Sequence, residues 1–291
     1  MQDDKRFAVL IDADNVSAKY IKYILDEISN YGVATYKRIY GDWTKPNTAS
    51  WKDLLLENSI TPVQQYGYTV GKNSTDSAMI IDAMDILYSG NVEGFCIVSS
   101  DSDFTKLASR LRESGMLVVG MGEKKTPKPF IAACNQFKFL DIIAETEQKD
   151  DEKLNIKGKT VDSNIYKNNV TESSQDNNSD SDKTMTDINI IKSTVIKMMN
   201  EVDEGTQRMN MGELGSRLVK RYPDFDVRNY GDTKLSKFLK KFDFLEITTD
   251  GRESSSMWVS LRTDKEQKQS IVAPAPRNKS QYKKNYKKKK R

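Results

Sequence analysis

Short apolar runs alternate with amphipathic segments over the first half of this chain, and this alternation restricts the possible folds more than any other feature. The runs predict buried strands at residues 7–12, 34–41, 61–68, 94–101 and 117–122. Apolar residues at helical spacing predict helices at 17–30, 50–58, 75–90 and 103–115, and after Pro127. Strands that alternate with helices imply crossover connections. The chain is therefore expected to form an α/β domain, with a mainly parallel sheet flanked by helices.

Acidic residues stand where two of these strands end. Asp12 and Asp14 stand at the end of the first strand, Asp101 and Asp103 stand at the end of the strand at 94–101, and Asp76 stands near the start of a helix. A single Asp in such a place is usually a helix N-cap. Ligand sites in open parallel sheets lie outside the carboxyl ends of the strands. The group as a whole therefore predicts carboxylates gathered at one edge.

The absence of His and of closely spaced cysteines excludes several kinds of catalytic and metal site. The chain has no His, which excludes Ser-His-Asp and Cys-His catalysis and every zinc site that needs His. Its two cysteines, Cys96 and Cys134, form no CxxC motif, and we expect two partly buried thiols, with a disulfide as the alternative. Oxygen ligands suit Mg²⁺ or Mn²⁺, so we expect one of these ions to act on phosphates.

Other phosphate-binding proteins fit the sequence less well. It has no GxxxxGK[ST] loop and no GxGxxG after the first strand, which argues against P-loop and dinucleotide-binding domains. The acidic motifs also lack the DxSxS pattern of adhesion-type metal sites. Asp12 and Asp14 superficially suit an aspartyl-phosphate phosphatase, with Val16 two positions later but beside the bulky Asn15. That alternative stays open at this point.

The segments IDADNV, KNSTDSAMIIDAMD and IVSSDSDF, in this order, resemble the NYN domain, a PIN-like nuclease family, in its LabA-like branch. The resemblance covers roughly residues 5–142 and includes ACNQFKFLD near its end. It implies metal-assisted hydrolysis of phosphodiesters.

The resemblance also assigns residues. The implied metal ligands and catalytic acids are Asp12, Asp76, Asp101 and Asp103, and Asn15 is implied to support the first acid as part of the catalytic group. Asp82 matches a second helix acid, but six residues turn a helix by about 600°, so Asp82 cannot share the face of Asp76. Near this edge, Lys72, Lys124 and Lys125 are candidate contacts for a substrate phosphate, with ordinary surface roles as the alternative.

A second unit follows. Three predicted helices, at 188–202, 209–223 and 230–242, precede a hairpin centred on Asp250-Gly251, which describes a smaller winged-helix (α+β) domain. The pattern MGELGSRLVKRYPDFDVRNYGDTKLSKFLKKFDFLEI resembles the OST-HTH/LOTUS domain. That resemblance implies RNA binding and leaves room for a protein partner. Lys234, Lys237 and Lys241 lie at helical spacing and are candidate phosphate contacts, or the solvated face of an amphipathic helix.

Charge is unevenly distributed. Residues 265–291 hold 11 basic residues and 1 acidic residue, whereas residues 146–186 are rich in Asn, Ser, Asp and Lys. We expect a disordered linker at 146–186 and a disordered basic tail that neutralises phosphates. The tail lysines proposed to contact nucleic acid are Lys283, Lys284, Lys287 and Lys288.

Together these patterns predict a nuclease domain at 1–145, the linker, a LOTUS domain at 187–264 and the tail. The expected function is metal-dependent hydrolysis of RNA, single-stranded or structured, with Mg or Mn as cofactor. A non-catalytic RNA-binding scaffold is the main alternative, and a DNA-directed winged-helix protein is a weaker one. We expect a cytoplasmic protein because no signal peptide or membrane span is evident.

Overall fold

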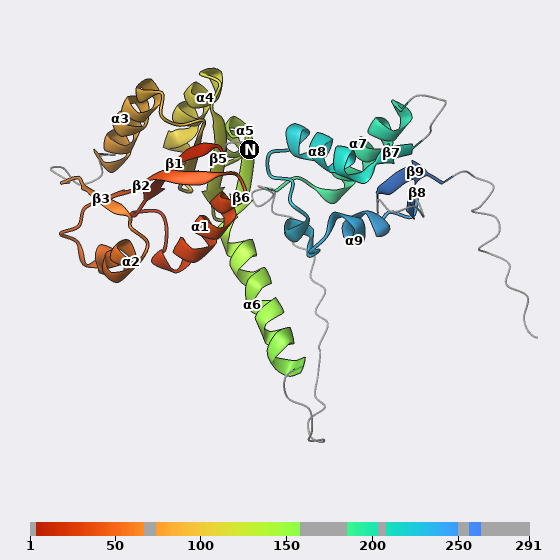
Figure 1. Ribbon diagram of the computed structural model, residues 1–291, viewed down its shortest axis with the longest axis horizontal. Coiled ribbons are helices and arrows are strands. Elements are labelled where there is room, and N and C mark those ends of the chain that lie inside the picture. The colour runs from red at the N-terminus through yellow and green to blue at the C-terminus, as the bar shows by residue number, and fades with distance from the viewer. Residues whose placement is uncertain (1–3, 67–73, 158–184, 203–207, 250–255, 263–291) are drawn as a thin grey trace, which may run out of the picture.

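The computed structural model describes residues 4–66, 74–157, 185–202, 208–249 and 256–262, which form two folded domains in contact (Figure 1). The first contains a six-stranded sheet in the order β3-β2-β1-β4-β5-β6, and every neighbouring pair is parallel. The strands are β1 (Arg6–Asp12), β2 (Val33–Gly41), β3 (Thr61–Gln64), β4 (Gly94–Val98), β5 (Leu117–Gly122) and β6 (Gln136–Phe139). The predicted parallel sheet is confirmed.

Helices cover both faces of this sheet (Figure 1). One face carries α3 (Ser74–Ser89), α4 (Thr105–Glu113) and α5 (Lys128–Ala133), and the other carries α1 (Ile21–Ser29), α2 (Lys52–Glu57) and α6 (Leu140–Lys157). Residues of β1 from Phe7 to Ile11 are completely buried, as expected for a central parallel strand. The fold is the PIN-like α/β arrangement.

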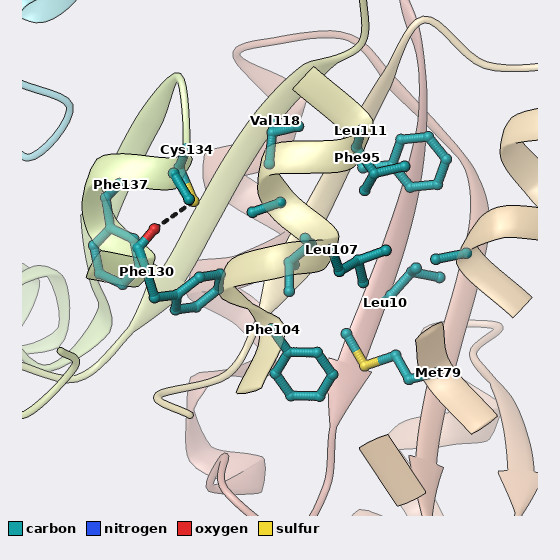
Figure 2. Packing of buried hydrophobic residues seen from close by; sticks show 14 of the residues in the cluster. Leu10, Met79, Phe95, Phe104, Leu107, Leu111, Val118, Phe130, Cys134 and Phe137 are labelled. Atoms are coloured by element: carbon teal, nitrogen blue, oxygen red, sulfur yellow. Dashed lines mark hydrogen bonds between the residues drawn. The ribbon is translucent and has the colours of Figure 1, made fainter. Parts of the chain in front are cut away.

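Large apolar side chains fill the space between α4, α5 and the sheet (Figure 2). Phe130 and Phe137 meet edge to face, with ring centroids 5.9 Å apart. The Cys134 thiol lies beside them and donates to the Phe130 carbonyl oxygen over 3.3 Å (Figure 2). Both Cys96 and Cys134 are buried free thiols, so the prediction of thiols rather than a disulfide is confirmed.

The second domain packs three helices, α7 (Ile188–Asn200), α8 (Met211–Arg221) and α9 (Leu235–Lys240), against a small antiparallel sheet. That sheet has the order β7-β9-β8, formed by β7 (Arg208–Asn210), β9 (Met257–Leu261) and β8 (Leu245–Thr249). The predicted helices and paired strands are present, and β7 is an additional strand that the sequence pattern did not indicate. The expected hairpin turn at Asp250-Gly251 lies outside the described residues.

One prediction about the linker is wrong in part. Helix α6 continues to Lys157, so residues 146–157 are helical rather than irregular. The segment EQKDDEKL contains the good helix formers Glu, Gln, Lys and Leu beside two Asp, although its composition is that of a polar linker. Residues 158–184 and the basic tail lie outside the described part of the chain. In that described part, no helix is long and apolar enough to cross a membrane.

A buried network of charged side chains joins the two domains. Lys138 on β6 pairs with Asp226 at 2.6 Å, and Arg228 pairs with Asp226 at 2.8 Å. Arg228 also reaches Glu27 on α1 at 2.6 Å, and the Glu27 side chain is only 9% exposed. Removing one partner from such a network leaves a buried charge uncompensated. The second domain is therefore docked on the first through specific charge pairs.

Candidate functional site

Three carboxylates from two separate segments meet beyond the carboxyl end of β4. One oxygen each of Asp76, Asp101 and Asp103 can be chosen so that all three lie within 4.8 Å of one another. Asp76 belongs to the first turn of α3, whereas the other two follow β4. We call these three residues the acid cluster. The convergence predicted from the sequence is thus present for these acids.

Local hydrogen bonds hold the turn that carries two of the acids. Asp101 is the N-cap of the short 3-10 helix η3 (Ser102–Phe104), and its Oδ1 accepts the backbone N–H of Asp103 over 2.9 Å. The Asp101 N–H donates in turn to Ser99 Oγ over 3.1 Å. Asp101 is therefore a helix cap and a member of the acid cluster at the same time.

Asp12 lies beside the acid cluster but outside the group of three. Its side chain is almost fully buried, and Oδ2 accepts from Asn15 Nδ2 over 2.7 Å and from Ser99 Oγ over 2.8 Å. Oδ1 accepts the Asp14 backbone N–H over 3.0 Å. Burial raises the pKa of Asp12 above its ordinary value, and these donors oppose the rise. The contact of Asn15 with the first acid is the one that the family resemblance implied.

The acidic side chains in this region repel one another. Burial is the largest cause that raises the pKa of Asp76, and together with the charges of Asp12, Asp101, Asp103 and Asp14 it brings that pKa to about 6. Within the part of the chain that the structure describes, neither Asp76 nor Asp101 forms an ion pair. Grouped carboxylate oxygens suit a hard divalent cation such as Mg²⁺ or Mn²⁺. The donor set therefore fits the metal that the sequence predicts.

Two hydroxyl residues that the sequence reasoning did not single out support this edge. Ser99 is completely buried and bridges Asp12 and the Asp101 backbone. Thr75 Oγ1 donates to Asp14 Oδ2 over 3.1 Å, which connects α3 to the loop after β1. Ser99 stands in the motif IVSSDSDF, so its place directly after a buried strand was the available signal.

Asp82 is not part of the acid cluster and instead binds residues of the sheet. It accepts hydrogen bonds from the Arg38 guanidinium and the Tyr40 hydroxyl, both on β2. It therefore connects α3 to the sheet about 1.7 turns away from Asp76, in line with the expected separation of the two acids.

The lysines predicted near this edge are exposed and paired with acids. Lys125 Nζ lies 2.9 Å from Glu123 Oε2, and Lys124 Nζ lies 3.7 Å from Glu145 Oε1. Both are partners of surface carboxylates, which is the ordinary role that the sequence left open. Lys72 lies outside the described residues.

The three lysines of the second domain that were predicted to contact phosphates differ in their surroundings. Lys234 is the N-cap residue of α9, and Lys237 stands in the last turn of that helix, with both side chains exposed. Lys241 instead pairs with Asp232 at 2.5 Å and donates to the Tyr230 carbonyl over 3.3 Å. It therefore helps to hold the loop before α9. The four tail lysines fall outside the described residues.

The parallel sheet with strand-end acids defines a PIN-like domain, and the docked second domain is a small helical unit with a three-stranded sheet. Residues 6–141 match the NYN domain, and residues 186–257 match the OST-HTH/LOTUS domain. The chain therefore carries an NYN domain, of the PIN-like nuclease superfamily, followed by an OST-HTH/LOTUS domain. The expected family and order are confirmed, while the predicted boundaries 1–145 and 187–264 stay predictions.

Two further proteins are similar to this chain. An uncharacterized protein of Methanocaldococcus jannaschii is 29% identical over 160 residues, which cover 54% of this chain and 62% of the relative's length. The crystal structure of a protein of unknown function from Vibrio parahaemolyticus matches with 18% identity and a TM-score of 0.41, over 48% of this chain and 94% of that one.

Proposed function

We propose that this chain is a divalent-metal-dependent ribonuclease, which hydrolyses RNA phosphodiester bonds at the acid cluster while the LOTUS domain and the lysine-rich tail hold RNA. The observation that carries the proposal is the meeting of Asp76, Asp101 and Asp103 within 4.8 Å. The NYN domain supports a nuclease-like activity, and the LOTUS domain supports RNA as the substrate.

Each acid at this edge of the sheet would have a defined role in the reaction. Asp76, Asp101 and Asp103 would hold Mg²⁺ or Mn²⁺, an ion that can orient a phosphate, lower the pKa of water and stabilise a leaving oxygen. Asn15 and Ser99 would hold the Asp12 carboxylate in a fixed orientation beside these three acids, because both donate hydrogen bonds to it. We include Asp12 among the metal-site acids, and the negative charge that it adds strengthens attraction of a cation.

The direct test is cleavage of labelled single-stranded RNA with Mg²⁺, with Mn²⁺ and with EDTA. Asp101→Asn should reduce the cleavage rate by about 100-fold or more, since removal of even supporting groups around a metal costs about 10- to 100-fold. Asp85→Asn is the matched control, because Asp85 is an exposed acid on α3 outside the acid cluster. The control should cut RNA at the wild-type rate.

RNA binding is measured in the same preparations. Retained binding with lost cleavage in Asp101→Asn would support the assignment of this acid to the chemistry. Binding without cleavage by the wild-type protein, across several RNAs and both metals, would contradict the proposal and favour the non-catalytic scaffold.

A further inference from the structure

A groove of about 530 Å³ lies between the two domains. The NYN side contributes residues from the end of α4 and the start of β6, and the LOTUS side contributes the end of α8. The polar lining residues and the proline at the junction are Arg112, Asn135, Gln136, Lys220, Arg221 and Pro223. Because both domains supply walls, neither domain alone could form this groove.

The walls of the groove are held together by bonds between the domains. The backbone N–H of Phe137, on the edge strand β6, donates to the carbonyl of Pro223 over 2.8 Å. Pro223 itself lines the groove, and Asp226 and Arg228, which pair with Lys138 and Glu27 of the first domain, follow it a few residues later. The docking therefore fixes the shape of the groove.

All charged residues that line the groove are basic. Arg112, Lys220 and Arg221 are its charged lining residues, and no carboxylate lines it. None of these three cations forms an ion pair within the residues that the structure describes. Lys124 and Lys125 near the acid cluster differ, because both face glutamates.

Two of these cations are also held in place. The Arg112 guanidinium donates to the carbonyl oxygens of Ala132 at 3.0 Å and Cys134 at 3.4 Å. The Arg221 guanidinium lies over the Tyr222 ring, 5.9 Å from its centroid. Cations that are already ordered lose less freedom when an anion binds, which favours binding of a polyanion.

We propose that this interdomain groove binds the phosphates of single-stranded RNA at a second site, separate from the acid cluster. The choice of RNA rests on the proposed function, whereas the preference for a polyanion rests on the groove itself. Leu117 and Gln136, the first residues of β5 and β6, line the groove, but the acid cluster lies beyond the carboxyl end of β4. The two sites therefore lie toward opposite ends of the strands, separated by about the length of the six-residue strand β5, on the order of 20 Å at about 3.3 Å per residue.

The test measures binding of the full chain to a labelled single-stranded 20-nucleotide RNA by fluorescence anisotropy, in EDTA and over a range of salt concentrations. The variant Lys220→Glu/Arg221→Glu removes two exposed groove cations, and Lys220→Gln/Arg221→Gln is the milder version. The control Arg110→Glu/Lys197→Glu makes the same change in net charge at exposed residues outside the groove. Thermal melting checks that each variant is folded.

We expect the groove variants to bind at least 10-fold more weakly at low salt. The slope of log affinity against log salt should fall by about 1.4, because each lost phosphate contact on a single strand contributes about 0.7. The control should lose less than about 3-fold and keep its slope. Equal affinity and slope in the folded groove variants and the control would overturn the proposal, and an acidic protein segment would then become the better candidate for the groove.

The readout is independent of catalysis. If the wild-type protein fails to cut RNA but the groove variants lose RNA binding, the ribonuclease proposal falls and the groove proposal stands. If RNA is cut normally and the groove variants bind like the control, only the groove proposal falls.

Discussion

Two groups of carboxylates in this protein have opposite electrostatic surroundings. In the acid cluster, burial and neighbouring acids raise the pKa of Asp76 to about 6. In the docking network between the domains, burial also opposes ionisation of Asp226, but its partners Arg228 and Lys138 outweigh that effect and lower its pKa. An aspartate at the interface is therefore stabilised in its charged form by neighbouring cations, whereas Asp76 at the sheet edge is destabilised in its charged form by neighbouring acids.

This difference separates a structural role from a ligand-binding role. The interface carboxylates already have their partners, so they contribute to docking without any added ion. In the acid cluster the neighbouring acids disfavour ionisation of Asp76, which costs stability unless a cation binds. Substitutions at one of these two groups of carboxylates should therefore leave the other group intact.

The largest effect is expected from Arg228→Met at the interface. It removes the cation between Glu27 and Asp226, and loss of one partner of a buried ion pair costs about 3–5 kcal/mol. Urea unfolding should show a loss of about 3 kcal/mol, near the lower limit because the Arg228 side chain is 25% exposed. Arg217→Met is the control, since its pair with Glu213 is exposed and worth about 0–1 kcal/mol. Similar losses in the two variants would mean that the network does not hold the domains.

A smaller effect is expected when the support of the acids is weakened. Ser99→Ala removes the hydroxyl that donates to Asp12 and accepts from the Asp101 backbone. We expect RNA cleavage to fall by about 10- to 100-fold, the usual cost of losing a group that orients a metal site. Ser102→Ala changes an exposed serine three residues further along the chain and should cut normally. Equal rates in the two variants would contradict the bridging role of Ser99.

The smallest predicted effect is a pH dependence of stability without metal. Asp76 has a folded pKa of about 6 against an ordinary value of 3.8, so its protonation favours the folded state. That contribution is present below about pH 4 and is lost as the pH rises through about 6. Asp226 adds no slope in this range, because its lowered pKa makes its contribution disappear only on further acidification.

Asp76→Asn should therefore reduce the loss of stability between pH 4 and 7 in EDTA. At pH 7.5 we expect its Tm to exceed that of the wild type by about 2–4 °C, which corresponds to about 1 kcal/mol. The Asp85→Asn control should follow the wild type at every pH. An unchanged pH profile in Asp76→Asn would show that this carboxylate is not strained by its neighbours.

Much of the fold could be predicted because its signals are local. The uninterrupted apolar run Phe7–Ile11 predicts a central strand whatever the positions of the helices. The parallel topology then places the acids at the strand ends, such as Asp101, at one edge of the sheet. The free thiols and the antiparallel pairing of β8 with β9 also followed from the sequence.

The docking of the domains could not be predicted in this way. Glu27, Lys138 and Arg228 are single charges far apart in the sequence, and nothing near any of them indicates its partners. The pairing of Lys241 could not be predicted for the same reason. Its spacing places it on a basic helix face, but it pairs with Asp232 from the preceding loop. The helical part of 146–157 was missed because composition was averaged over a longer polar segment.

The most direct test of the account is calorimetric titration of Mn²⁺ onto the metal-free protein, its Asp76→Asn/Asp101→Asn variant and its Asp85→Asn control. We predict saturable binding to the wild type and the control, and binding at least about 10-fold weaker in the double variant. Saturating Mn²⁺ at 100 times its Kd should also stabilise the wild type by about 2.7 kcal/mol. Equal Mn²⁺ affinity in all three proteins would contradict the claim that the acid cluster is a metal site.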